Sequence, residues 1–256
     1  MAVVNEKKLI AYFTSAGLRD TPGSGYQQRL WAATVSQSAL EHPESCLEWT
    51  QVDEVVSADE GPYLIADQAA GEPGLINAFR DPFLVSDSGA DYVVFSASSA
   101  QVDSKWNGCI GLAKRDELSG RWEHLAPLIQ SEGTSTELER AHIIRIDDLY
   151  YLFWSTPSYT FSPEVSGPTG LYGAVSDCID GGYRLLNDSG LVVANPASRP
   201  SQDYSWYVTQ DLRVQGFVDL PRKGTAIEEQ AWFAGTASVP FSLRLDGDRT
   251  RLEFFR

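Results

Sequence analysis

The chain has 256 residues, 43% of them hydrophobic and 21% charged, so it can bury a core and is not disordered. Its 35 acidic residues against 20 basic ones give a formal net charge of −15, which makes nucleic acids and anionic membrane surfaces poor partners. No apolar run is long enough to span a bilayer, and residues 1–10 do not have the pattern of a signal peptide.

Short segments rich in Val, Ile, Tyr, Phe and Trp, bounded by Gly, Pro, Asp, Asn and Ser, predict a chain made of strands. In chain order they cover residues 8–14, 29–36, 91–98, 108–114, 141–146, 149–155, 170–176, 205–209, 214–219 and 242–245. Only residues 30–37 also fit a helical pattern. The sequence therefore indicates an all-β fold.

Three tetrapeptides, at 79–82 (FRDP), 139–142 (ERAH) and 204–207 (YSWY), each open a run of strands and lie about 60 residues apart. After each of the first two come a tyrosine-rich strand, a glycine-containing strand and a fourth segment. This order predicts four-stranded meanders, the blades of a β-propeller, within a single domain over residues 1–256.

The first strand of a propeller blade lines the central axis, so the three openings are expected to meet at one site. The side chains concerned are Arg80, Asp81, Glu137, Glu139, Arg140 and Tyr204. Carboxylates with arginines are the groups that glycosyl transfer uses. An isolated Arg-Asp pair is more often a structural ion pair, and a Glu-x-Glu-Arg segment is as often a solvated edge. Because the two charged pairs occur at matching blade openings, we expect Asp81 and Glu139 to belong to the active site and not to structural ion pairs.

These motifs, taken in order, resemble the levansucrases and related fructosyltransferases of glycoside hydrolase family 68, most closely the Gram-negative branch. The resemblance extends from about residue 8 onward and implies a five-bladed β-propeller. The segments that carry it are 79–83 (FRDPF), 137–142 (ELERAH), 150–153 (YYLF), 159–161 with 167–177, 189–193, and 195–205.

By this resemblance Glu139 is the general acid/base, and Asp81 is the carboxylate that stabilises the transition state through the fructosyl hydroxyls. Arg80, Glu137, Arg140 and Tyr204 are sugar-binding or carboxylate-orienting neighbours. No cofactor is expected. The three cysteines, Cys46, Cys109 and Cys178, form no CxxC pair and have only three histidines to join them, so no metal site is expected either.

The sequence departs from the family pattern in three places. The family's nucleophile is the Asp of a Trp-Asp-x-Trp-Pro motif in the first blade, and this sequence contains no Trp-Asp dipeptide. A histidine after the YYLF strand is replaced near Pro157, and the Tyr-Ser-His motif reads Tyr204-Ser205-Trp206. The last two changes leave the acceptor open between water, an oligosaccharide and a growing polymer.

The motif positions imply part of blade two and blades three to five, after an N-terminal tail over residues 1–7. We expect a second, shorter polypeptide to supply the first blade and the nucleophile, although a misassigned start, processing or a degenerate fragment would also explain the pattern. The expected function is the larger subunit of a split, retaining, sucrose-cleaving fructosyltransferase. A simple β-fructofuranosidase and a non-catalytic sugar-binding protein are the alternatives. By family analogy the location is extracellular or periplasmic, with the cytoplasm left open.

Overall fold

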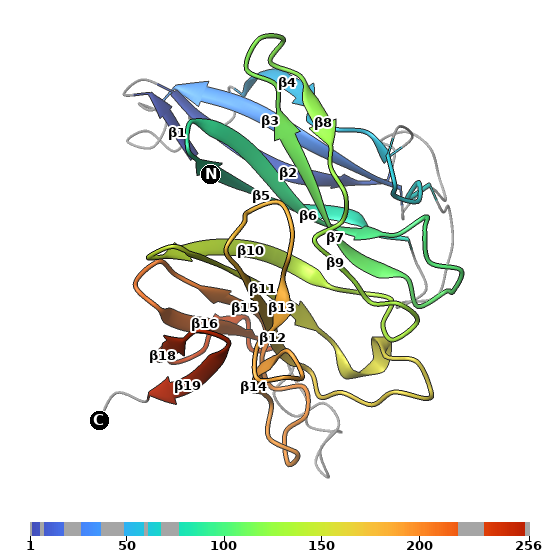
Figure 1. Cartoon of the computed structure of the whole chain (residues 1–256), viewed down its shortest axis with the longest axis vertical. Coiled ribbons are helices and arrows are strands. Elements are labelled where there is room, and N and C mark those ends of the chain that lie inside the picture. The colour runs from blue at the N-terminus through green and yellow to red at the C-terminus, as the bar shows by residue number, and fades with distance from the viewer. Residues whose placement is uncertain are drawn as a thin grey trace.

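The computed structural model describes residues 2–5, 8–17, 27–36, 49–58, 61–67, 77–219 and 233–253. They form four antiparallel sheets, each built from strands that are consecutive in the sequence (Figure 1). The expected all-β class is confirmed, because strands dominate the described residues and helical structure there is limited to short 3₁₀ turns such as η4 (Ser158–Thr160). No helix in the described ranges is long and apolar enough to cross a membrane.

The first two sheets are formed by the strands that precede residue 131, β1 to β9. The first sheet has the order β1 (Ala2–Asn5), β2 (Lys8–Ala16), β3 (Gln28–Ser36), β4 (Thr50–Glu54). The second has β5 (Phe79–Asp87), β6 (Ala90–Ser98), β7 (Gly108–Arg115), and then both β8 (Trp122–His124) and β9 (Ile129–Gln130), which pair with β7.

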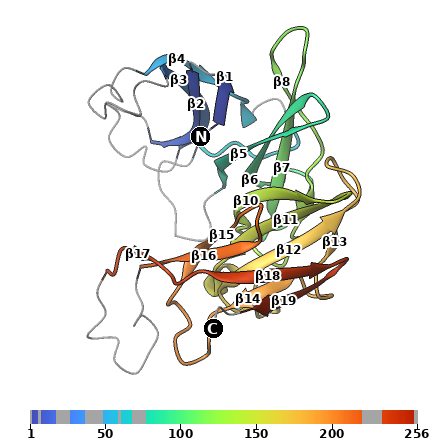
Figure 2. The ribbon, with the colours of Figure 1, turned by 90° about the vertical axis from the view of Figure 1, so that its left-hand side faces the viewer.

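The third and fourth sheets follow in the same way (Figure 2). The third has β10 (Glu139–Ile146), β11 (Leu149–Thr156), β12 (Gly170–Ser176), and then β13 (Arg184–Leu185) and β14 (Leu191–Ala194), which pair with β12. The fourth has the order β15 (Tyr204–Val208), β16 (Arg213–Val218), β18 (Phe241–Asp246), β19 (Arg249–Glu253), with β17 (Thr236–Ala237) paired to β16.

The ten strands predicted from sequence correspond to β2, β3, β6, β7, β10, β11, β12, β15, β16 and β18, with small differences at their ends. The beginning of the chain differs from expectation. The sequence predicts a tail over residues 1–7 and then only part of blade two, whereas Ala2–Asn5 pair with β2 and the first sheet has four strands. The valines at positions 3 and 4 are β-branched and favour a strand.

The fourth strand of the expected meander is split into two short strands in the second and third sheets. Pro127 lies between β8 and β9, and a proline cannot donate a backbone hydrogen bond to a continuous ladder. Between β13 and β14 the chain turns through Asn187, Asp188 and Gly190, which have φ of 53°, 63° and 80°. Left-handed residues of this kind end a strand.

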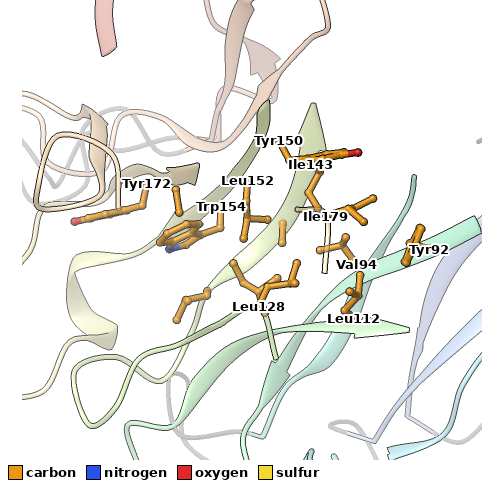
Figure 3. Packing of buried hydrophobic residues seen from close by; sticks show 14 of the residues in the cluster. Tyr92, Val94, Leu112, Leu128, Ile143, Tyr150, Leu152, Trp154, Tyr172 and Ile179 are labelled. Carbon is orange, nitrogen blue, oxygen red and sulfur yellow. The ribbon is translucent and has the colours of Figure 1, made fainter. Parts of the chain in front are cut away.

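The hydrophobic core consists of three main layers between successive sheets. The second sheet lies between the first and third sheets, and successive side chains of its strand β6 point to opposite faces. Val93 and Phe95 pack toward the first sheet, and Val94 packs toward the third. Figure 3 shows the layer between the second and third sheets, where Val94 and Leu112 meet Leu152. The layer between the third and fourth sheets buries Phe153 and Trp206. The second and third sheets are thus covered on both faces.

Two glycines allow an aromatic ring to lie across the centre of a sheet. Phe95 is opposite Gly111 in the β6–β7 ladder, and Phe153 is opposite Gly173 in the β11–β12 ladder. A Cβ at Gly111 would be 2.3 Å from the Phe95 ring, and one at Gly173 would be 2.9 Å from the Phe153 ring. The glycine-containing strands recognised in the sequence repeat therefore serve the same packing in both sheets.

Candidate active site

The inner strands β5, β10 and β15 each begin with the same irregularity. In each, one extra residue bulges out of the ladder with the second strand of its sheet. The bulge contains a non-glycine residue in the left-handed region: Asp81 at φ 60°, Arg140 at φ 54° and Ser205 at φ 55°. Backbone of this kind costs energy and concentrates at functional sites. The bulges redirect the side chains at the three openings away from simple strand alternation.

Arg80 is at the centre of the carboxylates that the sequence singles out. Its Nη2 lies 2.6 Å from Glu139 Oε1 and 3.3 Å from Glu137 Oε1, and its Nε lies 3.9 Å from Asp81 Oδ2. The four side chains are at most 20% exposed. One largely buried guanidinium thus joins three carboxylates that come from two successive sheets, as the repeat predicts.

Burial and mutual repulsion make this cluster bind protons tightly. Burial raises the pKa of Glu137 to about 7, with the Glu139 carboxylate adding to the effect and Arg80 opposing it. Burial also raises the pKa of Glu139. The charge of Arg80 opposes this rise, and the Asp81 carboxylate adds to it. Burial works against the charge of Arg80, but Glu139 and Glu137 outweigh it and raise the pKa of the guanidinium. A carboxyl group that keeps its proton near neutral pH can serve as a general acid.

The raised pKa of Glu137 predicts a specific dependence of stability on pH. A carboxyl that binds its proton more tightly when folded stabilises the protein at low pH, and this stabilisation is lost as pH rises from about 4.5 through about 7. Glu137→Gln should remove that component, worth about 2–3 kcal/mol in the free energy of unfolding. Urea unfolding of both proteins from pH 4.5 to 8 measures it. For the control variant Glu123→Gln, at an exposed position, the free energy of unfolding should change with pH in parallel to that of the wild type. The same parallel course for Glu137→Gln would contradict the prediction.

Arg140 and Tyr204 are placed differently from the other four residues. The Arg140 side chain is exposed and lines a cavity of about 470 Å³ together with Asp81, Phe83 and Tyr207. Tyr204 lines a separate cavity of about 130 Å³, and its hydroxyl has no hydrogen-bond partner among the described residues. The structure therefore joins Arg80, Asp81, Glu137 and Glu139 directly, and brings Tyr204 into no hydrogen bond with them.

Tyr159 lies near the carboxylates and lines the small cavity, and the sequence predicts no role for it. It lines the cavity with Tyr204, and its pKa is raised by burial and then by the carboxylates of Glu137 and Glu139. Tyr159 lies in the 3₁₀ turn η4, which follows Pro157. An aromatic side chain beside buried carboxylates suits contact with a sugar ring. Tyr159 belongs to segment 159–161 of the family resemblance, but its position in a loop gave no indication of a role at the site.

His142 fixes the backbone between the third and fourth sheets. Its Nε2 accepts a hydrogen bond from the Val208 amide at 2.9 Å, and its Nδ1 lies 3.1 Å from the Arg140 carbonyl oxygen. The ring is therefore neutral with its proton on Nδ1, and burial lowers its pKa to about 4. His142 holds the Arg140 bulge against β15 and is a structural residue.

Cys109 is buried in β7, Cys178 is exposed, and Cys46 lies outside the described residues. Among the described side chains no group of three or more His, Cys, Asp or Glu has the arrangement of a metal site.

Carboxylates gathered around an arginine at the openings of successive β-sheets form the kind of site found in glycoside-cleaving and glycosyl-transferring proteins. Residues 101–254, more than half of the chain, match the family described as Levansucrase/Invertase. The chain belongs to this family.

Two curated relatives agree. Over 145 residues the chain is 42% identical to a levansucrase from Erwinia amylovora, a match covering 56% of this chain and 34% of that protein. Over 144 residues it is 37% identical to a levansucrase from Zymomonas mobilis, covering 55% of this chain and 33% of that protein. The matched segments thus span about a third of the length of the curated relatives.

Solved structures extend the likeness to 96% of this chain. An inulosucrase from Halalkalicoccus jeotgali bound to kestose superposes with a TM-score of 0.79 at 31% identity, and the match covers 66% of that protein. A levansucrase from Gluconacetobacter diazotrophicus gives 0.76 at 22% identity and 59% coverage, which shows the fold. The four sheets of this chain therefore match the five-bladed propeller of the family over part of its length.

Proposed function

We propose that this chain supplies the acid/base and a second carboxylate to a retaining enzyme that cleaves sucrose or related fructosides and transfers the fructosyl group. The observation that carries the proposal is the contact of Arg80 with both Glu139 and Glu137 beside Asp81. Fructosides are the proposed substrates because of the family match and because the similar inulosucrase was solved with kestose bound.

In the proposed reaction Glu139 protonates the glycosidic oxygen and later deprotonates the acceptor. Asp81 accepts hydrogen bonds from fructosyl hydroxyls, and Arg80 keeps Glu139 and Glu137 in place. Arg140 and Tyr204 contact the parts of the substrate farther from the reacting carbon, Tyr204 from the 130 Å³ cavity that it lines. Pro157 and Trp206, which replace histidines of the family pattern, bear on the choice between water, oligosaccharide and polymer as acceptor.

The nucleophilic aspartate comes from a segment outside this sequence, and we propose that a second, shorter polypeptide provides it as part of a further sheet. The sequence has no Trp-Asp dipeptide. The 470 Å³ cavity is lined from both ends of the chain, by Phe13 of the first sheet and Tyr207 of the fourth, which are 40% and 46% exposed. Phe217, 40% exposed, lines a further cavity on the fourth sheet. Such apolar side chains suit packing against another sheet.

Purification of the tagged chain from its native cells tests this proposal. The expected particle contains a second polypeptide with a Trp-Asp-x-Trp-Pro segment and releases glucose from sucrose, whereas the isolated chain does not. Mixing the two purified chains should restore the release of glucose. An isolated, monodisperse chain that cleaves sucrose alone would contradict the split enzyme, and an inactive pair that still binds fructosides would favour the non-catalytic sugar-binding alternative.

A further inference from the structure

A hydroxyl on the second strand of each of the first three sheets binds the inner strand of the next sheet. The bulges leave one inner-strand amide per sheet without a ladder partner, and the hydroxyl accepts its hydrogen bond. The three bonds run from Asp81 N to Thr14 Oγ1 (2.9 Å), from Arg140 N to Ser96 Oγ (3.1 Å) and from Trp206 N to Ser155 Oγ (3.2 Å). This repeated bond is structural and requires only an acceptor oxygen.

Ser96 makes a second contact that its counterparts lack. Its hydroxyl donates to Asp81 Oδ2 at 3.2 Å, and Arg140 N lies 3.2 Å from the same oxygen. Ser96 is 1% exposed, so its hydroxyl is out of contact with bulk water. Within the described part of the chain both hydrogen bonds to this carboxylate fall on Oδ2, which leaves Oδ1 to accept from a sugar hydroxyl.

The carboxylate of Asp81 has a competing partner. Arg80 Nε lies 3.9 Å from Oδ2, too far for a hydrogen bond but near enough for charge attraction. Without the Ser96 hydroxyl, rotation about the side-chain bonds of Asp81 would bring the carboxylate onto the guanidinium. That movement would turn Asp81 away from its present position and draw Arg80 from Glu139.

Ser155 is the matched comparison for Ser96. In the β10–β11 ladder it lies opposite Glu139, as Ser96 lies opposite Arg80 in the β5–β6 ladder. Its hydroxyl accepts the Trp206 amide, but the residue that corresponds to Asp81 in this sheet is Arg140, which has no carboxylate to hold. Ser155 therefore has the structural bond without the contact to an acidic group.

We propose that Ser96 is a positioning residue: it holds the Asp81 carboxylate in the orientation that binds the fructosyl hydroxyls, and ties it to the backbone that carries Glu139. This inference rests on the proposed function. It adds to that function a buried group that touches no substrate and acts through Asp81 alone.

The test compares Ser96→Ala with Ser155→Ala in the enzyme assembled with the chain that supplies the nucleophile. Each variant loses one bond between sheets and Ser96→Ala also loses its bond to Asp81, so both melting temperatures should fall, that of Ser96→Ala at least as far. Ser96→Ala should lower kcat for sucrose by about tenfold to a hundredfold, because displacement of a catalytic group by about 1 Å has effects of this size. Ser155→Ala should keep kcat within about twofold of the wild type.

A second comparison asks whether Ser96 acts through Asp81. Adding Ser96→Ala to Asp81→Asn should lower kcat no further than Asp81→Asn alone, since coupled residues are not additive. Ser96→Cys, which keeps the size with a weak donor, replaces the alanine variant where that variant does not fold. Equal kcat for Ser96→Ala and Ser155→Ala in an active enzyme overturns the inference. A wild-type assembly that cleaves no fructoside overturns the proposed function instead.

Discussion

Replacing Glu139 with glutamine in the assembled enzyme is expected to lower the turnover of sucrose about a thousandfold, since a positioned general acid contributes between about 10² and 10⁴ in rate. Glutamine has nearly the same shape but cannot give a proton to the glycosidic oxygen. The raised pKa of Glu139, caused by burial against the opposing charge of Arg80, is what keeps that proton available. Initial rates of glucose release measure the effect.

A fructoside with an acidic phenol as its leaving group separates this role from others. Such a leaving group departs without protonation, so Glu139→Gln should slow the first step much less than it does with sucrose. Glu123→Gln changes a carboxylate on the exposed edge strand β8 and should leave both substrates unaffected. The same loss with both substrates, or normal turnover of sucrose, would remove Glu139 from the acid role.

Replacing Arg80 with methionine is expected to lower the free energy of unfolding at pH 7 by about 3–5 kcal/mol, the usual cost of leaving a buried charge without its partner. Glu137 and Glu139 would lose the guanidinium that lies 3.3 and 2.6 Å from them. The loss should shrink toward pH 4.5, because protonated carboxyls need no cation, and grow as the pH rises. Urea unfolding at pH 4.5 and pH 7 measures both effects.

Arg249→Met is the control for this variant. Arg249 makes two hydrogen bonds to Asp188, but both side chains are more than half exposed. Exposed ion pairs contribute little to stability, so this variant should differ only slightly from the wild type at either pH. If Arg80→Met were as stable as Arg249→Met, the buried carboxylates would not depend on Arg80 for their stability.

Much of the fold follows from local patterns in the sequence. The alternation in the strands, the glycines opposite Phe95 and Phe153, and the recurrence of the openings about every 60 residues all reflect packing that each sheet repeats. The same recurrence brings Arg80 and Glu139 together, since residues at equivalent places in neighbouring sheets must lie close. The repeat therefore allows these long-range contacts to be predicted from the sequence.

Other features depend on geometry that residue types do not specify. Nothing in the sequence marks Asp81, Arg140 and Ser205 as left-handed, because the bulges arise from how the ladders close. Ser96 looks like any small residue of a buried strand, and its role appears only when the next sheet is in place. Tyr204 has the same ladder position as Arg80 and Glu139 but lies by the smaller cavity, a placement that its position in the motif does not indicate.

The hydroxyl bonds between sheets also couple neighbouring sheets to one another in folding. Thr14 serves the second sheet, Ser96 the third and Ser155 the fourth, so each inner strand completes its hydrogen bonds only when the preceding sheet has formed. In a repeat protein, coupling between neighbours decides whether units unfold singly or together. Here each hydroxyl bond couples two neighbouring sheets, so removing one of these bonds is expected to make the sheets on its two sides unfold less cooperatively.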